Sequence, residues 1–140
     1  MKSVKFKNET YLDSTSIVHG RKKLSDLLEG TTLYDNSSGT TGTITLNESV
    51  ANFQRIKIEY KNIRNSFYNT IEIFNPNGKS SVLFSHYNGT YQYLYTAEIS
   101  ISGTSITFNY NQRVNMTNGD VGSDISTDVV LITKVIGFNY

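Results

Sequence analysis

Four tyrosines gathered in one short stretch are the residues whose type and spacing most suggest chemistry. They are Tyr87, Tyr91, Tyr93 and Tyr95. Exposed aromatic rings of this kind stack on sugar rings and bases. Within the predicted strand 90–101, however, the last three share the parity of Ile99 and Ile101, which turns them toward a core. A β-bulge would reverse part of that strand. Core or subunit contact is therefore favoured over a ligand platform, and both interpretations stay open.

Three carboxylates lie close together in the segment 118–128, on Asp120, Asp124 and Asp128. A loop rich in oxygen ligands can bind Ca²⁺, which takes 6–8 of them. The spacing does not match an EF-hand loop, which needs acidic or amide residues two apart and a distal glutamate. Aspartate and asparagine are also common turn residues. A solvated loop without a metal is therefore predicted.

Groups suited to catalysis are few. His19 and His86 are the only histidines and there is no cysteine, whereas a zinc site needs several ligands at paired spacing. No serine lies in a nucleophile-elbow pattern. Glu59, Glu72 and Glu98 fall on predicted solvent faces. We therefore expect no catalytic residues, no metal and no cofactor, and predict that the protein is not an enzyme.

Composition favours a β-rich protein. The chain has 140 residues, the size of one domain, and 47 of them are Ser, Thr or Asn, beside seventeen Phe and Tyr. Such a mixture is typical of strands joined by many turns. The net charge of +1 gives no reason to expect nucleic-acid binding. No stretch approaches the ~18 apolar residues of a membrane span, and the N-terminus lacks the apolar run of a signal peptide.

Two regions can be distinguished along the chain. Residues 1–30 are predicted to be an arm for assembly or connection, with a short strand near Val4 and a helix around 22–29 that ends before Gly30. Residues 31–140 read as strands separated by turns, which predicts an all-β protein, an antiparallel β-sandwich with jelly-roll topology. The candidate strands are 31–35, 42–46, 53–61, 68–75, 80–86, 90–101, 104–111 and 127–138.

Side-chain complementarity predicts the register of two hairpins. In the first, the favourable pairs are Ile58 with Ile71, Ile56 with Ile73 and Lys57 with Glu72, because a shift by one residue would set an isoleucine opposite a glutamate. In the second, a type II′ turn at Gly103-Thr104 gives the pairs Ile101 with Ile106, Ile99 with Phe108, Ala97 with Tyr110, Ser100 with Thr107 and Glu98 with Asn109.

Two predicted strands are apolar on both faces, at residues 82–84 and 129–132. Such strands are either central in a sheet or covered from outside. A neighbouring subunit is one candidate for that cover. The apolar residues of the arm, which include Ile17 and Leu24, also have no obvious partner within the chain.

Several segments resemble tail, baseplate and receptor-binding proteins of phages and prophages of Gram-positive bacteria. The resemblance is carried by Tyr11–His19, Leu24–Leu28, Thr43–Leu46, Phe53 with Ile56–Tyr60, and Lys134–Phe138. The family often has a tryptophan and a glycine where this chain has Leu33-Tyr34-Asp35. No catalytic residues are carried over from the family.

The resemblance implies a virion structural protein, made in the bacterial cytoplasm and located in the phage tail. It implies a homotrimer that contacts other tail or baseplate proteins and can touch a glycan of the host cell surface. The absence of cysteine and of a signal peptide suits such a part. The alternative is a carbohydrate-binding β-sandwich module of a bacterial protein, which is expected to be monomeric. A small glycan-active enzyme finds no support in the residues.

Overall fold

The computed structural model describes residues 4–5, 11–12, 18–19, 22–23, 28–64, 67–89, 92–123 and 130–140. Four short strands come first: β1 (Val4–Lys5), β2 (Tyr11–Leu12), β3 (Val18–His19) and β4 (Lys22–Lys23). From residue 31 onward the strands are β5 (Thr31–Thr40), β6 (Thr43–Thr45), β7 (Arg55–Asn62), β8 (Tyr68–Phe74), β9 (Lys79–Asn88), β10 (Gln92–Ser102), β11 (Ser105–Asn115), β12 (Val121–Ser123) and β13 (Val130–Phe138). A turn of 3₁₀ helix, η1, spans Val50–Asn52.

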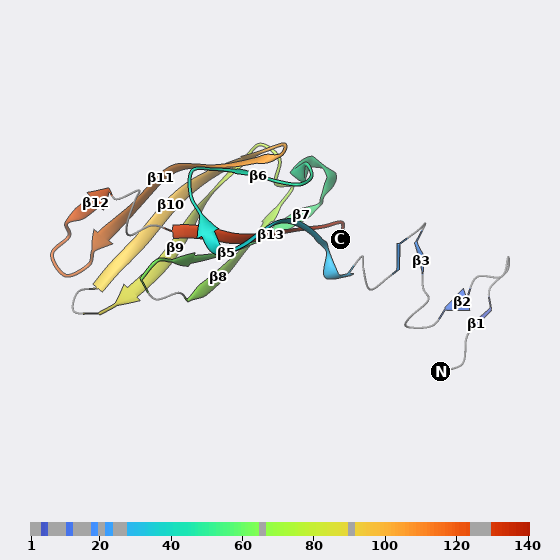
Figure 1. The fold of residues 1–140 in the computed structure, drawn as a ribbon, viewed down its shortest axis with the longest axis horizontal. Coiled ribbons are helices and arrows are strands. Elements are labelled where there is room, and N and C mark those ends of the chain that lie inside the picture. The colour runs from blue at the N-terminus through green and yellow to red at the C-terminus, as the bar shows by residue number, and fades with distance from the viewer. Residues whose placement is uncertain are drawn as a thin grey trace.

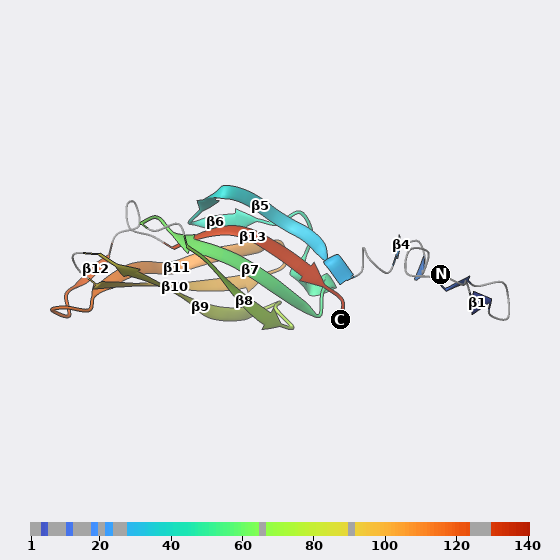
Figure 2. The same ribbon diagram turned by 90° about the horizontal axis from the view of Figure 1, so that it is seen from below.

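Two antiparallel sheets pack face to face (Figures 1 and 2). One has the order β12-β11-β10-β9, with β6 also paired to β11, and the other has the order β5-β13-β7-β8. The predicted all-β sandwich is therefore confirmed. The narrower jelly-roll prediction is not confirmed by this order, in which β9, β10 and β11 are consecutive neighbours in one sheet and β7 and β8 form a hairpin in the other.

The core lies between the sheets because each strand alternates buried and outward side chains. Strand β7 shows this most plainly, since Ile56 and Ile58 have no exposed surface while the charged residues beside them face outward. The largest fully buried side chains of the core are Leu33, Ile44, Val50, Ile56, Ile58, Leu83, Tyr95, Ile99, Ile101, Ile106, Ile132 and Val130. Val130 and Ile132 lie in β13, which is flanked by β5 and β7, so the strand predicted to be apolar on both faces is central in its sheet.

The β7–β8 hairpin has the predicted register. Ile58 lies opposite Ile71, Ile56 opposite Ile73, and Lys57 opposite Glu72. In the turn that follows β8, Gly78 has φ +75°. The hydrogen bond of this turn runs from the Lys79 amide to the Pro76 carbonyl at 3.1 Å.

The β10–β11 hairpin has the predicted register only near its turn. Gly103 has φ +55°, as the first central residue of a type II′ turn requires, and Ile101 lies opposite Ile106. Beyond Ile99 the register shifts by one residue, so that Asn109 is the extra residue of a β-bulge in β11. The predicted pairs of Ala97 with Tyr110 and Glu98 with Asn109 are therefore wrong. Ala97 lies opposite Asn111, and Glu98 opposite Tyr110.

The N-terminal region differs in part from the predicted helix. Lys22 and Lys23 form β4, which pairs with β3, so the helix does not begin at residue 22. Leu28 and Glu29 are helical, and Gly30 follows with φ +79°. The predicted strand near Val4 is present as β1, paired with β2. Ile17 and residues 24–27 lie outside the described residues.

The segment 118–128 contains a strand that the sequence analysis assigned to a loop. Residues 121–123 form β12, which pairs with Gln112, Arg113 and Val114 of β11. Before it, the Asn118 carboxamide donates to Asp120 Oδ2 at 2.7 Å, so this carboxylate is held within its own turn. Asp124 and Asp128 lie outside the described residues.

Candidate functional site

Three of the four candidate tyrosines form one cluster, which we name the tyrosine cluster: Tyr87, Tyr93 and Tyr95. Tyr87 of β9 lies opposite Tyr93 of β10. Their rings are stacked, with centroids 6.4 Å apart and planes at 21°. Tyr93 and Tyr95 follow at 6.2 Å in a tilted arrangement. Tyr91 lies outside the described residues.

The tyrosine cluster faces the interior of the sandwich, as the parity argument predicted. Because the bulge lies in β11, the pairing of β10 with β9 runs without a shift from Gln92 to Ile101, and the faces of β10 do not reverse. Tyr95 has no exposed surface and cannot meet a ligand in this arrangement. Tyr87 and Tyr93 are half-buried, so any ligand of the cluster has to bind at these two rings.

Polar groups surround the cluster. The Arg113 guanidinium lies 5.2 Å from the centroid of the Tyr93 ring, within the range of a cation–π interaction. The buried Asn62 carboxamide donates to Ser85 Oγ at 2.5 Å, and Ser85 lies opposite Tyr95. This end of the core is therefore more polar than the rest. A half-buried aromatic pair with a cation above it can stack on a sugar or on another planar group.

The carboxylates considered for acid–base chemistry are engaged with cations or amides on the outer faces. Glu59 forms an ion pair with Lys57 at 3.0 Å, and Glu98 accepts a hydrogen bond from the Asn109 carboxamide at 2.8 Å. Within the described parts of the chain, no group of three or more His, Asp or Glu side chains is placed to hold a metal ion. Likewise, no helix among the described residues is long and apolar enough to span a membrane.

Tyr60 is the buried phenol of β7, facing the opposite sheet. Burial raises the pKa of the Tyr60 phenol above its ordinary value of 10.0, and a hydrogen bond with the Phe84 backbone offsets part of this effect. The phenol is therefore neutral at physiological pH. Its contribution is structural, since a neutral hydroxyl with a backbone partner is well accommodated in a core.

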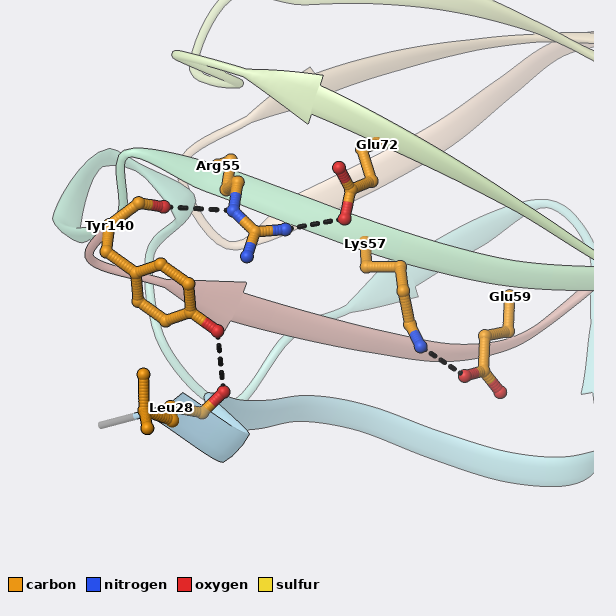
Figure 3. A network of polar contacts seen from close by, with 6 residues as sticks. All are labelled: Leu28, Arg55, Lys57, Glu59, Glu72 and Tyr140. Carbon is orange, nitrogen blue, oxygen red and sulfur yellow. Dashed lines mark hydrogen bonds and ion pairs between the residues drawn. The ribbon is translucent and has the colours of Figure 1, made fainter. Parts of the chain in front are cut away.

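A cluster around Arg55, which the sequence analysis missed, joins distant parts of the chain (Figure 3). The guanidinium carbon lies 4.2 Å from the Phe138 ring centroid and 4.8 Å from the Tyr140 ring centroid. Arg55 also donates to Glu72 Oε1 at 2.5 Å and to the Tyr140 backbone oxygen at 2.9 Å. The Tyr140 hydroxyl donates to the Leu28 carbonyl at 2.6 Å. The Arg55 cluster thus ties the start of the sandwich to its last strand.

Replacing Arg55 by alanine is expected to lower the free energy of unfolding by about 1–2 kcal/mol, because the arginine packs between two rings as well as pairing with Glu72. Its side chain is only 13% exposed. Lys57→Ala is the matched control, since Lys57 lies on the same face of β7 and pairs with Glu59, whereas its ammonium lies over no aromatic ring among the described residues. That variant should cost a few tenths of a kcal/mol. Urea denaturation of both variants measures the difference, and equal losses would contradict the role given to the rings.

The outer face of the β9-β10-β11 sheet carries an apolar patch, which we name the apolar outer face: Val82, Phe84, Leu94 and Val114. Phe84 is 54% exposed, and the other three side chains are half-buried. Phe84 of β9 lies opposite Thr96 of β10. Leu94 is on the same face of β10 as Thr96, two residues before it, and lies opposite Val114 of β11. The prediction that residues 82–84 are apolar on both faces is confirmed, because Leu83 fills the core between them.

Comparison of the chain with known protein families, with curated proteins and with solved structures found no match.

Proposed function

We propose that this protein is a non-enzymatic structural module of a phage or prophage tail. In this proposal the chain forms a homotrimer in the virion, contacts other tail or baseplate proteins, and touches the host cell surface. The support comes from the sequence resemblance and from the apolar outer face, where the Phe84 ring is 54% exposed. The proposal includes no catalytic step, and the three glutamates considered for acid–base chemistry, Glu59, Glu72 and Glu98, are each engaged with a cation or an amide on the outer faces.

The structural observation that supports assembly is the apolar outer face. Its register across β9, β10 and β11 makes the exposed Phe84 ring continuous with the half-buried Leu94 and Val114. Apolar surface of this kind gains free energy when a second subunit removes it from water, by roughly 25 cal/mol per Å². A closed ring of subunits covers the same patch on every copy. The three-fold symmetry is taken from the phage resemblance.

Sedimentation equilibrium of the full chain tests the assembly. A mass of three chains at micromolar concentration is expected, and Phe84→Glu should shift the population to monomer because it places a charge in the apolar contact. Phe74→Glu is the matched control, since Phe74 is 64% exposed on the outer face of the other sheet, in edge strand β8. It should leave the mass unchanged. A full-length monomer rejects the assembly, and equal effects of both variants would reject the choice of face.

A free carbohydrate-binding module is the second candidate function. The stacked, half-buried rings of Tyr87 and Tyr93 favour it, because such rings pack against sugars. A monomer in the same sedimentation experiment would favour this candidate over the tail protein. A trimer with no affinity for sugars would count against it.

A further inference from the structure

One edge of β11 contains a gap in its pairing. On that edge β11 pairs with β6 at residues 105–107 and with β12 at residues 112–114. In these two ladders, residues 108–111 have no partner. One backbone bond crosses the gap, from the Phe108 amide to the Gly42 carbonyl at 2.9 Å. A stretch of strand edge without a partner strand leaves room and polar backbone groups for another molecule.

The β-bulge lies inside this gap and separates two aromatic side chains. In a regular strand, Phe108 and Tyr110 would point to the same face. Because Asn109 is inserted between them, Phe108 lies opposite Ile99 and packs on the core, whereas Tyr110 lies opposite Glu98 and is 38% exposed. Bulges recur beside functional sites because they redirect a side chain in this way.

A cavity of about 210 Å³ occupies the gap. The residues that line it together carry two aromatic rings, two carboxamides and two hydroxyls: Thr41, Gly42, Phe108, Asn109, Tyr110 and Asn111. None of these side chains carries a charge. A Cβ placed on Gly42 would have no atom within 4 Å, so the backbone there is open to approach. The volume is below the roughly 300–1,000 Å³ of sites for drug-sized ligands, which limits the occupant to about one ring.

Some polar groups of the lining already form hydrogen bonds within the chain, and others can bond to a ligand. Asn111 Nδ2 donates to the Val130 carbonyl, and Asn111 Oδ1 accepts from the Val130 amide. Asn109 Nδ2 donates to Glu98 Oε1 and Ser100 Oγ. The hydroxyls of Thr41 and Tyr110 make no hydrogen bond within the part of the chain that the structure describes. These two groups can pair with hydroxyls of a ligand, while the aromatic rings can cover an apolar face of it.

We propose that this cavity binds one neutral sugar ring, such as a hexose or N-acetylhexosamine unit of a surface glycan. A pyranose has an apolar C–H face for a ring and hydroxyls for the polar lining, and an uncharged lining selects against anionic sugars. This deepens the proposed function, since it rests on contact between the sandwich and the cell surface. It places that contact at the β11 bulge and not at the tyrosine cluster.

The test is saturation-transfer NMR on the full chain with glucose, galactose and N-acetylglucosamine as probes. Binding of at least one sugar with a dissociation constant in the millimolar range is expected for a site of this size. Tyr110→Ala should weaken binding at least tenfold, and Thr41→Trp, which fills the cavity, should do the same. Tyr68→Ala is the matched control, because Tyr68 is 57% exposed on β8 in the other sheet, and it should leave binding unchanged.

Each outcome decides the proposal. Absence of saturation transfer from all three sugars to a chain with an intact thermal transition would overturn it. Binding that survives Tyr110→Ala but is lost in Tyr87→Ala would also overturn it, in favour of the tyrosine cluster. The oligomer mass is measured separately, without sugar. A trimer that binds no sugar therefore rejects this inference and leaves the structural role intact.

Discussion

Replacing Ile101 by aspartate is expected to lower the free energy of unfolding by roughly 3–5 kcal/mol. Ile101 is 1% exposed and lies opposite Ile106, which has no exposed surface. A carboxylate at this position would lose its hydration without gaining a partner, and the packing of the isoleucine would be lost as well. Urea denaturation followed by far-UV circular dichroism measures the loss as a lower midpoint.

Ser102→Asp is the control for this substitution. Ser102 is the next residue of β10, and its side chain is exposed, so the same charge there should change stability by about 0.5 kcal/mol or less. If Ile101→Asp prevents folding altogether, Ile101→Ala gives a measurable loss of about 2–4 kcal/mol. An Ile101→Asp variant with the midpoint of the parent chain would show that the hairpin register is wrong.

The hairpin registers were predictable because the information lies within each hairpin. Gly103 allows the positive φ of a two-residue turn, and the isoleucines on either side of it pair directly. In the β7–β8 hairpin, only one register keeps Lys57 opposite Glu72 and the isoleucines together. Local complementarity of this kind does not depend on the rest of the fold.

The β11 bulge was not predictable from the hairpin alone. Its consequence is that Asn111, and not Tyr110, faces the core, and this polar residue is accommodated there by Val130 of β13. The strand that satisfies the asparagine is therefore in the other sheet. The hairpin pattern alone places the aromatic Tyr110 at the core position. Val130, whose backbone makes Asn111 acceptable there, lies nineteen residues further along the chain.

The candidate sites, too, were predictable only where the information lies within one strand or hairpin. The parity of the tyrosines within β10 predicted that Tyr95 points inward, and it is fully buried. The Arg55 cluster depends on the pairing of β7 with β13, which brings Arg55 opposite Phe138. The cavity at the bulge needs the β5–β6 turn beside β11. Neither arrangement can be read from spacing, because each joins strands that are far apart in the sequence.

Replacing Asn111 by leucine is expected to lower the free energy of unfolding by about 3 kcal/mol. Asn111 is 3% exposed. Its Nδ2 donates to the Val130 carbonyl at 2.9 Å, and its Oδ1 accepts from the Val130 amide at 3.0 Å. The carboxamide thus replaces a strand partner for the backbone at the start of β13. Leucine has the same branching at Cγ but leaves both backbone groups of the buried Val130 without these bonds.

Asn111→Asp separates the hydrogen bonds from packing, because it differs from the parent chain in one terminal group. At low pH the neutral carboxyl can still donate to the Val130 carbonyl and accept from its amide. Ionisation would set a buried charge against that carbonyl, so the pKa of the new carboxyl should be raised in the folded state above its unfolded value of about 3.9. A raised pKa gives stability that is present below the unfolded value and is lost as pH rises through the folded value. Asn109→Ala, in the exposed bulge, should show no such pH dependence. An Asn111→Asp variant whose stability relative to the parent chain is the same at acidic and neutral pH would contradict this role for Asn111.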